Sequence, residues 1–307
     1  MPAFFVVGAA KAGTTALHNI LLQHPNVFLP QMKETNYFAF QGDTVDFKGP
    51  LDDQTINRFS ITAAADYASL FDPAAPGQRS GEVCPSYLYI EKAAGAIFEY
   101  LPSARIIIML RNPADRAFSN YLNLVRDGRE RLSFAEALQA EEERKAAGWE
   151  WFWHLYAVGL YATQVRRYIE RFGRDHVLLL LYEDFRRDPR SHIERIFRFI
   201  DVDADVLIDT SGSYNLSGRP WKPITRLYEM LLGPTALNRM LRAVMPESLR
   251  KRAGGAFKGM TTRSEVLSPA ERHTLLERYE PDIARLETDT GLDCRVWREA
   301  PAGAVPP

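Results

Sequence analysis

The segment Gly8-Ala-Ala-Lys11-Ala-Gly13-Thr14-Thr15 has residue types and a spacing that suit phosphate binding. Its two glycines form the Gly-x-x-x-x-Gly frame of a phosphate-binding loop, but a nucleoside triphosphatase would continue that frame with Gly-Lys-Ser/Thr. Here the residue after Gly13 is Thr14, and the lysine lies inside the loop, at position 11. The segment therefore predicts an anion site whose chemistry differs from that of a triphosphatase.

The flanking residues predict the elements that would position this loop. Residues 4–7 are apolar, as in a buried strand, and residues 16–24 place apolar side chains on one helical face before Pro25 ends the helix. The first amides of a helix have no internal partners, so an anion in the loop would receive them together with the Thr hydroxyls and the Lys11 charge. An ordinary glycine turn between strand and helix is the alternative interpretation.

A second anion-binding segment follows the apolar strand expected at residues 105–110. A triphosphatase needs an Asp at such a strand end to hold magnesium. Arg111 stands here instead, and its guanidinium suits a phosphate directly. Ser119, about two turns into the next helix, would converge on the same anion, unless Arg111 pairs with Asp115. Two anion sites without a magnesium carboxylate predict a nucleotide with two separated phosphates.

Alternating strands and helices predict the fold that brings these two segments together. A third apolar strand is expected at 177–182, and helices are expected at about 114–126, 155–172 and 188–200, with a Ser133–Glu136 capping box opening another. Residues 41–80 carry turn signals and are expected to be irregular. The pattern indicates an α/β fold with a P-loop-like parallel sheet flanked by helices, whose ligands bind at the carboxyl ends of the strands.

Length and composition bound the remaining possibilities. The 307 residues predict a single domain over 1–300 with a helical, basic C-terminal insertion at 224–260 and a disordered Pro- and Ala-rich tail at 301–307. The insertion is a lid, a partner surface or a helix that contacts a membrane peripherally. A net charge of −1 argues against nucleic acid. We expect a cytoplasmic protein, because the chain has two cysteines and an early first strand that leaves no room for a signal peptide. We expect no membrane span, because the sequence has no long apolar run.

Taken together, these motifs resemble the sulfotransferases that use 3′-phosphoadenosine-5′-phosphosulfate, most closely the branch with the heparan sulfate sulfotransferases and many bacterial relatives. Lys11–Thr15 is similar to the family's 5′-phosphosulfate loop, and Arg111, Arg116, Ser119 and Tyr121 stand in the pattern of its 3′-phosphate motif. Four further segments also match, over a likeness that spans about residues 3–222: Lys33–Phe38, Glu82–Tyr87, Tyr182–Pro189 and Ser217–Pro220.

The resemblance implies in-line transfer of a sulfuryl group to a hydroxyl or amine, with adenosine 3′,5′-bisphosphate as the leaving group and no metal required. It implies that Lys11 stabilises the leaving phosphate and that Glu34 is the general base. The cofactor contacts that it implies are Lys11, Ala12, Gly13, Thr14, Thr15, Arg111, Ser119, Ser217, Gly218 and Arg219. Val83 stands where heparan-type enzymes carry a second lysine. The positive charge of that lysine is missing here or is supplied by Arg219 or Lys222. The replacement disfavours a glycosaminoglycan acceptor.

The acceptor itself is predicted only as a small molecule, a lipid or a carbohydrate. Tyr37, Phe38, Trp153 and His154 are candidates for its cleft, because aromatic faces bind sugars and apolar chains. His154 is also the competing base, since the small-molecule branch of the family uses a histidine. A degenerate P-loop kinase or NTPase, which would bind ATP with magnesium, and a non-catalytic nucleotide-binding protein are the alternatives. The sequence indicates no oligomeric state.

Overall fold

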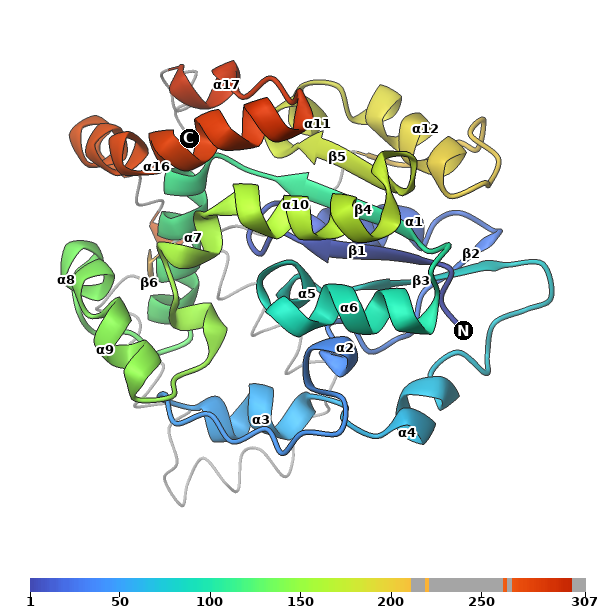
Figure 1. Ribbon diagram of the computed structural model, residues 1–307, viewed down its shortest axis with the longest axis horizontal. Coiled ribbons are helices and arrows are strands. Elements are labelled where there is room, and N and C mark those ends of the chain that lie inside the picture. The colour runs from blue at the N-terminus through green and yellow to red at the C-terminus, as the bar shows by residue number, and fades with distance from the viewer. Residues whose placement is uncertain (211–218, 221–261, 264–266, 300–307) are drawn as a thin grey trace.

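The computed structural model of the chain describes residues 1–210, 219–220, 262–263 and 267–299 (Figure 1). For residues 219–220 and 262–263 it describes the backbone alone, as a short antiparallel pair of strands, β6 (Arg219–Pro220) and β7 (Thr262–Arg263). The predicted insertion at 224–260, the tail at 301–307, and the candidate residues Ser217, Gly218 and Lys222 lie outside the described residues.

Five strands form the sheet on which the molecule is built. They are β1 (Phe4–Gly8), β2 (Val27–Phe28), β3 (Arg79–Val83), β4 (Arg105–Leu110) and β5 (Val177–Leu181), in the order β2-β3-β1-β4-β5. Every pairing within this sheet is parallel, which confirms the predicted α/β sheet. The central strands are buried along most of their length, as expected for a parallel sheet covered on both faces.

Helices cover both faces of the sheet. In Figure 1, α6 (Glu91–Tyr100) and α10 (Tyr161–Phe172) lie in front of the sheet and α1 (Thr14–Leu21) lies behind it. The long α16 (Pro269–Thr290) packs against α10 and α7 (Pro113–Arg126). The other α-helices in the described ranges are α2 (Tyr37–Phe40), α3 (Ile56–Phe59), α4 (Ala64–Ser69), α5 (Ser86–Tyr89), α8 (Phe134–Gln139), α9 (Glu141–Ala146), α11 (Tyr182–Arg187), α12 (Pro189–Phe199) and α17 (Arg295–Arg298).

The strand β3 is the main departure from the sequence-based expectation. Residues 41–80 contain α3, α4 and the start of β3, although polar residues and a glycine make the segment a poor strand former. Gly81 pairs with Phe4 of β1, and a Cβ at this glycine would stand 2.1 Å from the Phe4 ring. The strand therefore forms because the missing side chain lets the sheet backbone accept a neighbouring ring, which no local pattern reveals.

Side-chain caps set the start of two predicted helices. Asn112 accepts hydrogen bonds from the amides of Ala114 and Asp115, and Pro113 follows it, so α7 begins directly after β4. The predicted capping box between Ser133 and Glu136 is present at α8.

The helix expected from about residue 155 begins instead at Tyr161, after the 3₁₀ turn Ala157–Gly159. Tyr279 of α16 donates its hydroxyl to the Tyr156 carbonyl, 2.9 Å away, and its ring leaves no room for a Cβ at Gly159. A contact from the far end of the chain thus delays the helix.

Candidate functional site

The glycine loop lies between the carboxyl end of β1 and the start of α1. Gly13 is the N-cap of α1 with φ 88°, a conformation that favours glycine, and a Cβ there would stand 2.9 Å from the Tyr182 ring. Within the described residues, no side chain caps the amides of the first turn of α1. These amides are thus available for an anion, as the sequence predicts.

Lys11 is a partly buried cation that reaches across to α7. Its Nζ donates to Oδ1 of Asn123 at 3.1 Å, and no carboxylate in the described part of the chain forms an ion pair with it. The pKa of Lys11 is lowered to about 8, first by burial and then by the charges of Arg126 and Arg111, while the charges of Glu34 and Asp127 partly oppose that shift. Binding of an anion here would relieve the repulsion within this group of cations.

Arg111 links the two anion-binding segments that the sequence predicts. It follows β4, the neighbour of β1, and its guanidinium donates to the carbonyl of Lys11 at 3.0 Å while stacking 5.0 Å from the centre of the Tyr182 ring. The alternative pairing of Arg111 with Asp115 is wrong, because Asp115 pairs with Arg272 of α16 at 3.1 Å. Ser119 lies buried on α7, the helix that β4 leads into.

Arg126 is a site residue that the sequence-based reasoning missed. Its guanidinium donates to the same Asn123 oxygen that receives Lys11, at 2.5 Å, so one amide oxygen holds two cations. The signal was available: Ser119, Asn123 and Arg126 are spaced by four and three residues and thus share one face of a helix. The structure places that face beside the glycine loop.

Glu34 is held next to the carboxyl end of β3. Its backbone amide donates to the carbonyl of Val83 at 3.2 Å, and its carboxylate, 46% exposed, pairs with Lys33. The adjacent Thr35 donates its hydroxyl to Glu82. The Glu34 charge acts on Lys11, so the two candidate catalytic groups lie near one another.

The anchor for this segment is the buried carboxyl of Glu82. Besides Thr35, it accepts hydrogen bonds from the hydroxyls of Tyr67 at 2.6 Å and Tyr87 at 2.8 Å. Burial raises the pKa of Glu82, and the three hydroxyl donors oppose that rise. This satisfied network fixes the backbone that carries Glu34.

Backbone conformation singles out the same two residues. Lys11 has φ 63° and Glu34 has φ 62°, both in the left-handed region that non-glycine residues rarely adopt. Only three other non-glycine residues in the described ranges have positive φ: Asn36, Leu51 and Asp201. Such strain persists where the surroundings impose it, and it concentrates at functional sites.

A cleft of about 440 Å³ opens beside Glu34. The four residues proposed from the sequence are not in its lining, which consists of Met32, Lys33, Glu34, Asn36, Thr55, Ile56, Phe59, Arg129, Glu150, Trp151 and Phe152. The right stretch of chain, around 149–154, does reach the cleft, but through Trp151 and Phe152.

Tyr37, Phe38, Trp153 and His154, which the sequence suggests for an acceptor cleft, do not line this one. Phe38 is 1% exposed and packs its ring 5.4 Å from that of Phe5, in the core with Tyr37. Trp153 is 0% exposed and donates its indole N–H to the buried Asp52. His154 accepts or donates a hydrogen bond with the Tyr89 hydroxyl at 2.9 Å, away from the cleft lining.

The fold and the site define a class of protein: a parallel α/β protein with a phosphate-type loop that carries a lysine and with an arginine at the end of the neighbouring strand. A model of the sulfotransferase family matches residues 2–205, and the chain belongs to that family. It is 35% identical to a sulfotransferase from Alicyclobacillus acidocaldarius of known crystal structure, with a TM-score of 0.76 over 97% of this chain and 99% of that one. These matches confirm the resemblance seen in the sequence.

Two curated human relatives are each 28% identical to the chain. One is the bifunctional heparan sulfate N-deacetylase/N-sulfotransferase 2, matched over 66% of this chain and 22% of the relative, and the other is heparan sulfate glucosamine 3-O-sulfotransferase 6, matched over 66% and 52%. The chain thus spans about a fifth and about half of the lengths of these relatives. Among the helices that the structure describes, none is long and apolar enough to cross a membrane.

Proposed function

We propose that this chain transfers a sulfuryl group from 3′-phosphoadenosine-5′-phosphosulfate to an acceptor hydroxyl or amine and releases adenosine 3′,5′-bisphosphate. The observation that carries the proposal is Lys11, a partly buried lysine inside a glycine loop, close to two arginines and to the carboxylate of Glu34, whose backbone is strained. Family membership supports sulfuryl transfer in general, and this arrangement supports the donor and the roles below.

The loop would bind the donor's 5′ end. Lys11 and the free amides at the start of α1 would stabilise the charge that grows on the leaving phosphate oxygen, and Arg126 would add a second cation at the same place. Arg126 thereby offers the charge that Val83 cannot supply. Arg111 and Ser119, with the loop residues Ala12–Thr15, complete the donor contacts that we propose, and Ser217–Arg219 remain a proposal from the resemblance alone.

Glu34 would take the acceptor's proton. Its carboxylate is accessible from the cleft, and Lys33 holds it in place until an acceptor arrives. The reaction needs no metal in this scheme, because Lys11 and the arginines meet the charge that magnesium meets in phosphoryl transfer. The two cysteines, Cys84 and Cys294, are buried free thiols, which supports the cytoplasmic location that we include in the proposal.

Calorimetry and a transfer assay test the proposal together. We expect adenosine 3′,5′-bisphosphate to bind without metal, Arg111→Ala to weaken that binding, and Lys11→Ala to abolish transfer. Glu34→Gln should lose transfer and keep nucleotide binding, and near-normal transfer in this variant would refute the role of Glu34 as base. Binding of ATP with magnesium in preference to the bisphosphate would instead favour a kinase or NTPase.

A further inference from the structure

The residues that line the cleft beside Glu34 indicate the chemical class of the acceptor. We infer that the acceptor is an uncharged alcohol or phenol on an apolar aryl or alkyl body, and that the chain does not act on a polyanionic polysaccharide. This inference rests on the proposed function and adds the acceptor class to it. It follows from the apolar wall of the cleft, from the pairing of its charges and from the rigidity of its polar end.

Apolar side chains form much of the wall. Phe59 is 57% exposed and Met32 is 39% exposed, which is unusual for side chains of this size, and both face the cleft. Ile56, Trp151 and Phe152 add to the same surface. Exposed apolar side chains gathered in one concave site mark a place where an apolar ligand is bound. A volume of about 440 Å³ suits a small molecule.

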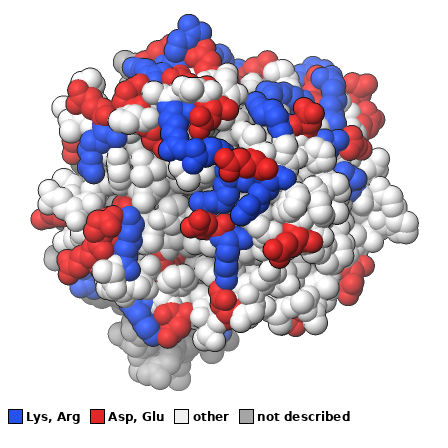
Figure 2. Space-filling model, in the orientation of Figure 1, with Lys and Arg blue, Asp and Glu red and all other residues white. Residues whose placement is uncertain are grey.

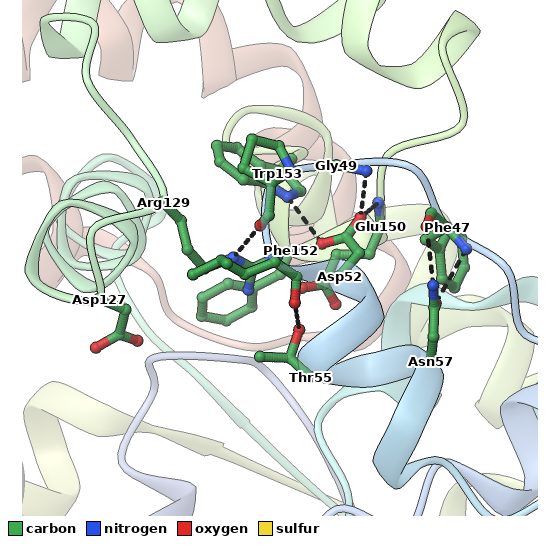
Figure 3. A network of polar contacts seen from close by, with 12 residues as sticks. Phe47, Gly49, Asp52, Thr55, Asn57, Asp127, Arg129, Glu150, Phe152 and Trp153 are labelled. Carbon is green, nitrogen blue, oxygen red and sulfur yellow. Dashed lines mark hydrogen bonds and ion pairs between the residues drawn. The ribbon is translucent and has the colours of Figure 1, made fainter. Parts of the chain in front are cut away.

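Among the residues that the structure describes, the charges in the lining leave no unpaired cation for a polyanion. The two cations among the lining residues are Lys33 and Arg129, and each is already paired: Lys33 with Glu34, and Arg129 with Glu150 at 2.6 Å and with the buried Asp52. Figure 3 shows the carboxylates of Asp52 and Glu150 and the ring of Trp153 gathered around the end of Arg129. Each cation of the described lining thus already has a carboxylate partner, and a sulfated chain would find no unpaired positive charge there.

The polar end of the cleft is also fixed, so that Arg129 is not available to turn toward a sulfate. Its Nε donates to the Pro50 carbonyl at 3.0 Å, and its guanidinium lies 5.1 Å from the centre of the Trp153 ring. The backbone amide of Glu150 donates to Asp52 at 3.1 Å. Across the face of the molecule shown in Figure 2, Lys and Arg side chains are likewise interspersed with Asp and Glu.

The transfer step balances with such an acceptor. The acceptor oxygen attacks the sulfur, forming a new S–O bond, while the S–O bond to the 5′-phosphate breaks and its electron pair stays on the phosphate oxygen. The hydroxyl proton passes to Glu34, and the apolar body of the acceptor remains against Phe59 and Met32. The products are a sulfate ester and adenosine 3′,5′-bisphosphate, with no further reactant needed.

A labelled-donor assay with the full chain tests the inference. The acceptors are 2-naphthol, 1-decanol and a heparan sulfate oligosaccharide, and adenosine 3′,5′-bisphosphate binding is measured in parallel. We expect kcat/KM to be at least about 100-fold higher for the better alcohol than for the oligosaccharide. Phe59→Ala should lower kcat/KM for that alcohol about tenfold, the change that about 1.4 kcal/mol produces, and leave nucleotide affinity unchanged. Leu207→Ala is the matched control, because Leu207 is an exposed apolar residue outside the cleft lining.

The outcomes separate the two proposals. Preferred transfer to the oligosaccharide, with Phe59→Ala without effect, overturns the acceptor class and leaves sulfuryl transfer standing. Nucleotide binding without transfer to either alcohol also overturns the acceptor class. The absence of both nucleotide binding and transfer overturns the proposed function itself. Alcohol transfer that depends on Phe59 and not on Leu207 supports the inference.

Discussion

Replacing Arg126 with alanine should raise the pKa of Lys11, because the two side chains share one oxygen of Asn123. The Lys11 and Arg126 nitrogens lie 3.1 and 2.5 Å from that oxygen, so they are within about 6 Å of each other. Two like charges at that distance repel by about 3 kcal/mol at an effective dielectric constant of about 20. The Arg126 side chain is 27% exposed, and screening by water reduces this to about 1.4 kcal/mol, or about one pKa unit.

The sign of the effect on activity follows from the charge that Lys11 must carry. In the role that we propose, Lys11 stabilises the leaving phosphate as a cation, so activity should be lost as the pH rises through its pKa of about 8. The pH profile of kcat/KM for the donor reports groups of the free enzyme. We expect its alkaline limb near pH 8 in the unchanged protein and about one unit higher in Arg126→Ala, even though the rate at neutral pH falls.

Two control variants separate charge from structure. Arg126→Lys keeps a cation near Asn123 and should keep the limb close to its original position. Arg166→Ala removes a cation on α10 that pairs with Glu170, and should leave the limb unchanged. If Arg126→Ala keeps both the alkaline limb of the pH profile and the melting temperature of the unchanged protein, the charge coupling between Arg126 and Lys11 is refuted. If it keeps the limb but lowers the melting temperature, Arg126 has a structural role only.

Three further predictions concern stability and reactivity. Gly81→Ala should destabilise the fold by about 2 kcal/mol or more, because its Cβ would stand 2.1 Å from the Phe4 ring of β1. Gly95→Ala in α6 has 3.7 Å to its nearest neighbour and should instead stabilise the fold by about 0.5–1 kcal/mol. Urea unfolding measures both variants, and equal effects would refute the packing argument. Burial raises the pKa of Glu150 to about 7, so the folded state keeps a proton that the unfolded chain releases above pH 4.5. The free energy of unfolding should therefore fall as the pH rises from about 4.5 to about 7. Glu150→Gln should lose this pH dependence in unfolding curves taken across the range. Burial also raises the pKa of the Cys84 and Cys294 thiols, so neither should react with a thiol reagent until the protein unfolds, and rapid labelling of the native protein would contradict the buried placement.

The placement of the glycine loop beside Arg111 could be predicted from the sequence because both segments are local. The loop at Gly8–Thr15 and the arginine at 111 each follow directly from a strongly apolar strand, and parallel strands bring their carboxyl ends to one edge. Caps such as Asn112 then fix where the next helix begins. Arg126 could have been found by the same reasoning, since its spacing from Ser119 places it on the same helical face.

The acceptor half could not be predicted, because neighbouring residues there face opposite ways for long-range reasons. Phe152 lines the cleft, whereas Trp153 is buried because its indole finds Asp52, about a hundred residues earlier in the chain. Phe38 likewise turns into the core against Phe5, and the exposed Phe59 lay in a segment expected to be irregular. Aromatic composition located the region but not the side chains that a ligand would touch.

The position of the loop lysine now has a physical explanation. A lysine at position 14 would begin α1, where Thr14 is buried at the base of the helix. From position 11, with its backbone held at φ 63°, the lysine side chain instead reaches Asn123 and Arg126 on α7. Lys11 and Arg126 therefore meet at Asn123, and the charge of Glu34 also acts on Lys11. A donor bound there would place its leaving oxygen against Lys11 and Arg126 and its sulfur toward Glu34 and the cleft. This arrangement suits transfer of a terminal group to an acceptor in that cleft, with the charge of the leaving phosphate met by side chains.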